Sequence, residues 1–120
     1  MTKTERLNLL NKYNGKCAYC GVDLKGKFQA DHINPIHRGY SDFHLEKMKV
    51  VRGLDIIQNI TPACRRCNAF KSTFTLEKFR EEISEQVKRT RRYSFNFRLA
   101  EDYGLVKETN IEVKFYFETL

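Results

Sequence analysis

The sequence has no apolar run approaching the ~20 residues of a membrane-spanning helix, although 41% of its 120 residues are hydrophobic. Residues 1–16 are charged and amphipathic and lack the apolar core of a signal peptide. Internal repeats and low-complexity tracts are also absent. These absences argue against a membrane partner and favour an intracellular, cytoplasmic protein. The length suits one domain with at most a short appendage.

Acidic residues are scarce relative to basic ones. The chain has 15 Asp and Glu against 22 Lys and Arg, which gives a net charge of +7. Residues 1–92 contain 19 basic and 10 acidic residues, whereas residues 93–120 contain 3 and 5. The positive charge of the first part fits a polyanionic partner such as nucleic acid. Charge alone leaves open a basic protein without such a partner.

The only four cysteines form two Cys-x-x-Cys pairs, Cys17/Cys20 and Cys64/Cys67. Two such pairs can present four thiolates to one tetrahedral Zn²⁺, and disulfides are disfavoured in the cytosol. We therefore predict a structural zinc site, with disulfides or a thiol redox role as alternatives. The 43 residues between the pairs exceed the ~15–20 of a simple zinc ribbon. Something substantial is therefore inserted between the two knuckles.

Apolar spacing and turn residues predict an α+β fold. We expect a helix over 4–14 that ends at Gly15, a strand over 28–33, and a loop over 40–53 with a helical turn near 43–49. A second strand over 54–61 runs into Pro62, and a helix begins within 68–72. Beyond it we expect a long helix from the N-cap Thr75 into the basic run 88–92, a helix ending at Gly104, and a half-buried strand over 111–117.

Four polar residues near the knuckles could hydrolyse a phosphodiester bond: Asp31, His32, Asn59 and Asn68. A carboxylate and an amide oxygen suit Mg²⁺ or Mn²⁺, and an imidazole can take a proton from water. The second amide could bond the ring or fix the nearby backbone. Adjacent strand residues point to opposite faces, so Asp31 and His32 can share one site only at the edge of the strand. Taken singly, each of these residues could equally be a turn, cap or loop residue.

Together these residues resemble a known family. The segments DHINP (31–35) and NITPACRRCNAFK (59–71), with the Cys17 knuckle, are similar to the HNH endonuclease motif in its four-cysteine, zinc-bearing form. The likeness runs from about Cys17 to Lys71, just under half the chain. The third signature position, often histidine in the family, is Asn68 here. Two departures stand out. The chain has Gly39-Tyr40 where the family often has a Gly-Gly pair, and the interval from His32 to Asn59 is long, so residues 40–53 look like an insertion.

The resemblance implies a small ββα-metal fold and a metal-dependent endonuclease acting on DNA. In it His32 is the general base, Asp31 and Asn68 hold the catalytic Mg²⁺ or Mn²⁺, and Asn59 orients His32. Residues 1–92 would form the nuclease domain, with knuckles at 17–20 and 64–67. Residues 93–120 would be a helix-strand extension packed on that domain. The insertion 40–53 would be a loop above the site.

Basic residues near the motif could bind nucleic acid, although a solvated basic face is a close alternative. They are Arg65, Arg66, Lys71, Lys88, Arg89, Arg91 and Arg92. We interpret His37 and His44 as ordinary polar residues. Two rival functions remain, both without catalysis. One is a zinc-dependent nucleic-acid-binding module, and the other is a structural zinc protein that docks a partner on the strand 111–117.

Overall fold

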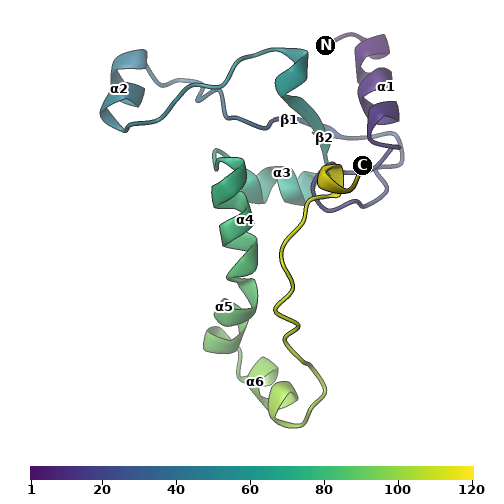
Figure 1. Ribbon diagram of the computed structural model, residues 1–120, viewed down its shortest axis with the longest axis vertical. Helices are drawn as coiled ribbons and strands as arrows, with labels where there is room; N and C mark the ends of the chain where they lie inside the picture. The colour runs from purple at the N-terminus through teal and green to yellow at the C-terminus, as the bar shows by residue number, and fades with distance from the viewer. The chain divides into compact units, whose positions relative to one another are not determined.

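A computed structural model describes all of residues 1–120, and its elements are labelled in Figure 1. The chain divides into two compact units. The first comprises Met1–Leu76 together with Lys114–Leu120, and the second comprises Glu77–Val113. The functional division at residue 92 stays a prediction, because these units are defined by contacts alone. No helix has the length and apolar character needed to cross a membrane.

The first unit begins with helix α1 (Lys3–Lys12). Its N-terminus is a capping box, in which the Thr2 hydroxyl accepts from the Glu5 amide and the Glu5 carboxylate accepts from the Thr2 amide. Gly15, in the left-handed region at φ 71°, turns the chain after the helix. Leu9 and Tyr13 are the buried residues of this segment. The expected helix and its stop are confirmed.

The sheet has two antiparallel strands, β1 (Gln29–His32) and β2 (Ile60–Ala63), with Asp31 opposite Thr61 and His32 opposite Ile60. The first strand agrees with the prediction. The second starts later than expected, because residues 57–59 form the 3₁₀ turn η1 (Ile57–Asn59). Pro62 lies inside β2 and does not end it, since each strand of a two-stranded sheet is an edge that tolerates proline.

Two short helices follow the strands along the chain, one between β1 and β2 and the other directly after β2. Helix α2 (Asp42–Lys47) is the helical turn expected in the insertion, and the Ser41 hydroxyl caps it by accepting from the His44 amide. Helix α3 (Arg65–Lys71) begins earlier than predicted, because Cys64 is its N-cap and its sulfur accepts from the Cys67 amide. The second knuckle therefore includes the first turn of α3.

The prediction of a half-buried strand over 111–117 is wrong. The segment pairs with no strand, and Ile111 is 79% exposed. Phe115 is only 1% exposed and lies edge-on to Tyr19, with ring centroids 5.4 Å apart. The amides of Tyr116 and Phe117 bond the carbonyls of Tyr19 and Ala18, and η2 (Tyr116–Thr119) follows. The buried Phe115 ring and two backbone hydrogen bonds to the first knuckle hold this segment in place of strand pairing. The segment therefore offers no strand edge on which a partner protein could dock.

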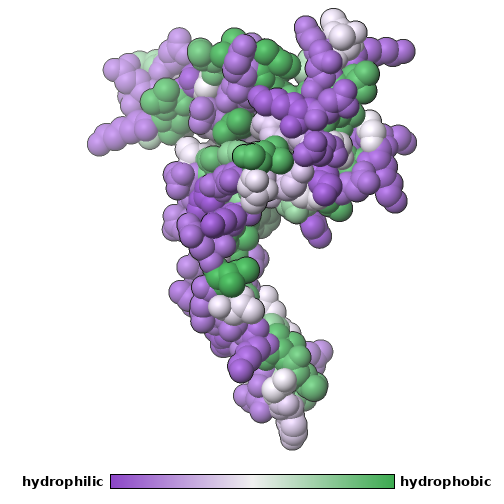
Figure 2. All heavy atoms as spheres, turned by 45° about the vertical axis from the view of Figure 1, so that its right-hand side comes forward, coloured by the Kyte–Doolittle hydropathy of each residue, from purple (hydrophilic) through white to green (hydrophobic).

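The second unit contains most of α4 (Leu76–Ser84), with α5 (Gln86–Tyr93) and α6 (Phe95–Asp102). A single helix was expected through residue 92, but it breaks at Glu85, where the preceding Ser84 hydroxyl bonds back to the Glu81 carbonyl. The helix ending near Gly104 is confirmed. Arg91 forms ion pairs with Glu101 and Glu108, both at 2.8 Å, and joins α5 to α6. Figure 2 shows one face of the whole chain, and most of its surface is hydrophilic.

Phe115→Ala tests how the C-terminal segment is held. Removing this buried ring should lower the free energy of unfolding by about 3–5 kcal/mol, because it leaves a cavity beside Tyr19. Ile111→Ala is the matched control, and it should change stability by less than about 0.5 kcal/mol because the side chain is exposed. Urea denaturation of both variants measures the difference. Equal losses of stability in the two variants would contradict the burial of Phe115 beside Tyr19 and would favour a strand over 111–117.

Candidate metal centre and catalytic cavity

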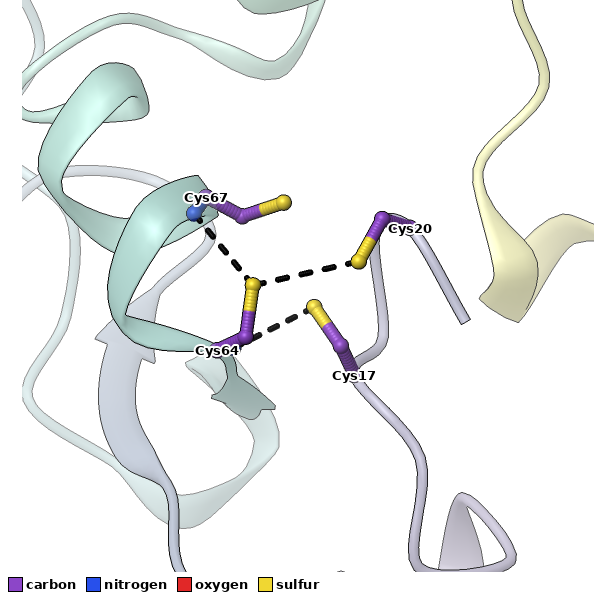
Figure 3. A group of neighbouring side chains, drawn as sticks. All are labelled: Cys17, Cys20, Cys64 and Cys67. Carbon is purple, nitrogen blue, oxygen red and sulfur yellow. Dashed lines mark hydrogen bonds between the residues drawn. The ribbon is translucent and has the colours of Figure 1, made fainter. Parts of the chain in front are cut away.

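The four cysteine sulfurs converge from the two knuckles, as Figure 3 shows. All four lie within 4.8 Å of one another, and those of Cys20 and Cys64 are 3.8 Å apart. Tetrahedral Zn–S bonds of ~2.3 Å require sulfurs about 3.8 Å apart. All four thiols are free of disulfides. The cluster thus has the ligand type, number and spacing of a structural zinc site.

Hydrogen bonds prepare the cluster to hold negative charge. The Cys64 amide donates to the Cys17 sulfur at 3.3 Å, and the Cys67 amide to the Cys64 sulfur at 3.4 Å. The Cys67 thiol bonds the Cys17 sulfur and lowers the pKa of Cys17 to about 4. The same hydrogen bond raises the pKa of Cys67. One thiolate is therefore favoured at neutral pH before any cation binds.

Asp31, His32 and Asn68 line one open cavity of about 310 Å³. Asp31 and His32 come from the end of β1, and Asn68 comes from α3. Neighbouring strand residues normally face opposite ways, yet here both border the same space. Asp31 and His32 thus share a cavity as one site at the edge of the strand requires, while their joint catalytic role stays a prediction.

The Asp31 carboxylate is 6% exposed and is held through one oxygen. Its Oδ2 accepts from the Tyr19 hydroxyl at 2.5 Å and lies 3.1 Å from the Lys71 ammonium. Burial, and next the charge of Asp31, raise the pKa of Tyr19, so its hydroxyl stays a donor. Oδ1 has no hydrogen-bond partner. An oxygen of this kind, with the amide oxygen of Asn68 on the same cavity, fits a hard divalent cation.

Lys71 does not fit its predicted place among the phosphate contacts. Its side chain is fully buried, and its ammonium donates to the His32 carbonyl at 2.9 Å besides pairing with Asp31. A buried ammonium needs a carboxylate and further acceptors to offset its lost hydration. Lys71 therefore supports the end of β1 from within and does not face a nucleic acid.

The His32 ring is held by a residue that the sequence analysis missed. Its Nε2 lies 2.8 Å from Oδ1 of Asp55, and this hydrogen bond lowers the pKa of Asp55. An ionised carboxylate can only accept, so Nε2 bears the proton and the neutral ring keeps its lone pair on Nδ1. A catalytic role for His32 would therefore use Nδ1.

Asn59 bonds the backbone and not the imidazole. Its amide nitrogen donates to the carbonyls of Asn34 at 2.9 Å and Leu54 at 2.8 Å, and its oxygen accepts from the Asn34 amide at 2.9 Å. Leu54 directly precedes Asp55, the partner of His32. Asn59 thus holds the backbone beside Asp55, which is the backbone-fixing option considered from the sequence, and its role in orienting His32 stays a prediction.

The remaining predicted basic residues fall into two groups. Arg65 and Arg66 are exposed on α3 and form no ion pair. In the second unit, Arg92 is exposed, whereas Lys88 pairs with Glu85, Arg89 with Glu82, and Arg91 with two glutamates. The ion pairs within the second unit therefore neutralise much of the positive charge of these basic residues.

Some residues at the site gave no signal in the sequence. Tyr19 could have been suspected from its place inside the first knuckle, but Asp55 lies just after the insertion 40–53, without any motif. The cavity is also bordered by Tyr40, where the insertion begins, and by His37 and Arg38 just before it. His37, interpreted from the sequence as an ordinary polar residue, therefore borders the candidate site.

Comparisons with known proteins agree with this arrangement. Residues 17–74 match the family model described as HNH endonuclease. Over 70 residues the chain is 37% identical to the "SPbeta prophage-derived putative HNH endonuclease YoqL" of Bacillus subtilis (strain 168). That alignment covers 56% of this chain and 27% of the relative, so the chain spans about a quarter of the relative's length. No solved structure matches the chain significantly.

The matched region includes both cysteine pairs and every residue proposed from the motif, from Asp31 to Asn68. The structure brings the four cysteines into one cluster, and Asp31, His32 and Asn68 to one cavity that Asn59 does not line. Residues 17–74 of this chain therefore match the HNH endonuclease family model, in agreement with the relative's printed name.

Proposed function

We propose that this protein is a metal-dependent endonuclease that hydrolyses DNA phosphodiester bonds. One observation supports it above all others. The adjacent residues Asp31 and His32 and the distant Asn68 border a single open cavity. A binding module has no need for a carboxylate, an imidazole and an amide in one cavity. The order β1, β2, α3 around that cavity is what a ββα-metal arrangement requires.

Asp31 and Asn68 are the proposed ligands of a catalytic Mg²⁺ or Mn²⁺. Tyr19 and Lys71 engage Oδ2 of Asp31 and leave Oδ1 for coordination. A bound divalent cation supplies charge stabilisation at the phosphate and at the leaving oxygen. The hard oxygen donors favour these ions over softer metals.

His32 is the proposed general base. Asp55 accepts from Nε2, so the free lone pair on Nδ1 can take the proton of the attacking water. Asn59 keeps the backbone next to Asp55 in place, which preserves the ring orientation. In-line attack by that water breaks the P–O3′ bond, so that one fragment ends in a 3′-hydroxyl, once the leaving oxygen is protonated, and the other in a 5′-phosphate.

Nucleic acid is the substrate that the family implies, and the positive charge of residues 1–92 agrees with it. DNA is our proposal for the kind of nucleic acid. Plasmid nicking in Mg²⁺ or Mn²⁺ by the wild type, beside His32→Ala, tests the whole assignment. Binding without cutting would favour the zinc-dependent binding module.

The zinc assignment predicts about one Zn per chain in elemental analysis of the purified protein. Thiolate coordination contributes directly to folding free energy. A chelator that strips the ion should therefore unfold residues 17–20 and 64–67, with loss of amide protection there. Zinc-free protein with two disulfides by mass spectrometry would refute the assignment.

Asn68→Ala should abolish cleavage while zinc content and thermal stability stay near wild type, because Asn68 is not a cysteine-cluster ligand. Asp31→Asn is the better variant at the other position. Asp31→Ala would leave the buried Lys71 ammonium unpaired, at a cost of roughly 3–5 kcal/mol. Plasmid cleavage, zinc analysis and melting curves together separate lost chemistry from lost folding. Loss of zinc in Asn68→Ala would mean that the two sites are drawn wrongly.

His32→Ala should reduce the cleavage rate by ~10²–10⁴-fold while DNA binding persists, since only proton abstraction is removed. Asp55→Asn should show a milder loss, because the amide can donate as well as accept and no longer fixes which ring nitrogen bears the proton. Single-turnover cleavage and a gel-shift assay measure the two effects. His32→Ala cutting at the wild-type rate, with contaminating nuclease excluded, would remove His32 from the mechanism.

A further inference from the structure

A single arginine holds the start of the insertion in shape. The Arg52 guanidinium donates to the carbonyls of Ile36 at 2.6 Å and His37 at 3.0 Å, and also to that of Tyr40. Its Nε donates to the Asp42 carboxylate at 3.2 Å. Three carbonyls and a carboxylate on one planar fork fix both the path and the width of residues 36–42. We call this segment the clamped loop.

The clamped loop is backbone-strained as well as clamped. His37 has φ 51° and Gly39 has φ 80°, so two left-handed residues lie within three positions. Left-handed backbone is uncommon for residues other than glycine, and it persists where the surroundings enforce it. Here the enforcing group is Arg52. A strained, over-determined loop beside a candidate active site indicates a segment held ready for a ligand.

The clamped loop presents an aromatic ring and a free cation to the catalytic cavity. Tyr40 is 48% exposed, and its ring makes edge-on contacts with the imidazoles of His37 and His44. The centroid of the Tyr40 ring is 6.3 Å from the centroid of each imidazole. Arg38 is exposed and forms no ion pair or hydrogen bond. Both residues border the cavity that Asp31, His32 and Asn68 line. The side chains that border the cavity thus include an exposed guanidinium, whose charge also acts on Asp55, and a ring in contact with two imidazoles.

We propose that the clamped loop is a DNA-binding element, in which Arg38 contacts a backbone phosphate next to the scissile one and the Tyr40 ring packs on the neighbouring nucleotide. The inference rests on the proposed function, because it takes the cavity as the place of the scissile phosphate. An exposed arginine that forms no ion pair suits phosphate, and an aromatic face suits a base or sugar. A ring fixed in advance loses little entropy on binding.

The test measures the affinity of a fluorescein-labelled DNA duplex by anisotropy, without added Mg²⁺ or Mn²⁺, over a range of salt concentrations. Tyr40→Ala should weaken binding about tenfold, while Tyr40→Phe stays near wild type because the ring remains. Arg38→Ala should lower the slope of log affinity against log salt by about 0.9, as expected for one lost phosphate contact.

Arg52→Lys separates loop shape from charge. A lysine keeps the positive charge but cannot bridge three carbonyls, so binding should weaken with the salt slope unchanged. Tyr103→Ala is the matched control for Tyr40, since Tyr103 is a 77% exposed tyrosine of the other unit. It should bind as the wild type does. Melting curves and zinc content establish that each variant is folded.

The outcomes distinguish this inference from the proposed function. If the wild type neither binds nor cuts DNA, the proposed function fails and the loop assignment fails with it. If the wild type binds and cuts, but Tyr40→Ala and Arg38→Ala both bind within twofold of it, only the loop assignment is overturned. Weakened binding by both variants, with the control unchanged, supports it.

Discussion

The rest of the first unit depends on the convergence of four cysteines. One pair precedes β1, and the other begins immediately after β2, where Cys64 also caps α3. Bringing the four sulfurs together therefore fixes one end of the two-stranded sheet, where β1 starts and β2 ends, and the start of the helix beside it. A chain of this size buries a modest core, and two strands of four residues are not stable alone. The cluster supplies the constraint that a larger sheet would otherwise provide.

The same constraint extends to the candidate catalytic carboxylate. Tyr19 lies between the two cysteines of the first knuckle, and Lys71 ends the helix that starts in the second knuckle. Both bond Oδ2 of Asp31. The carboxylate is therefore oriented from both halves of the cluster at once. Burying a charge costs free energy unless every partner is in place. The position of the Asp31 carboxylate therefore depends on the cysteine cluster that positions Tyr19 and Lys71.

The sequence revealed those features that lie close together along the chain. The cysteine pairs, Asp31-His32 and Asn68 are recognisable because their chemistry requires short, fixed spacings. The contact of Asp55 with His32 spans 23 residues and depends on the fold of the insertion, which no periodicity predicts. Lys71 was misjudged because charge suggests exposure, whereas its burial depends on a partner 40 residues away. Alternation over 111–117 predicted a strand, but only Phe115 finds a buried site and no strand is available to pair with it.

The proposed DNA contact and the hydrogen bond that holds His32 lie on one segment, which runs from residue 34 to residue 55. Its two ends are joined by Asn59, which bonds Asn34 and Leu54, and by Gly53, where any Cβ would collide with the Asn34 carbonyl. Arg52, next to Gly53, clamps the outgoing side, and Asp55 on the returning side holds the imidazole. The segment that reaches beyond the cavity and the segment that fixes the ring are thus one closed loop. A change in the fold of this loop therefore acts on recognition and on the ring together.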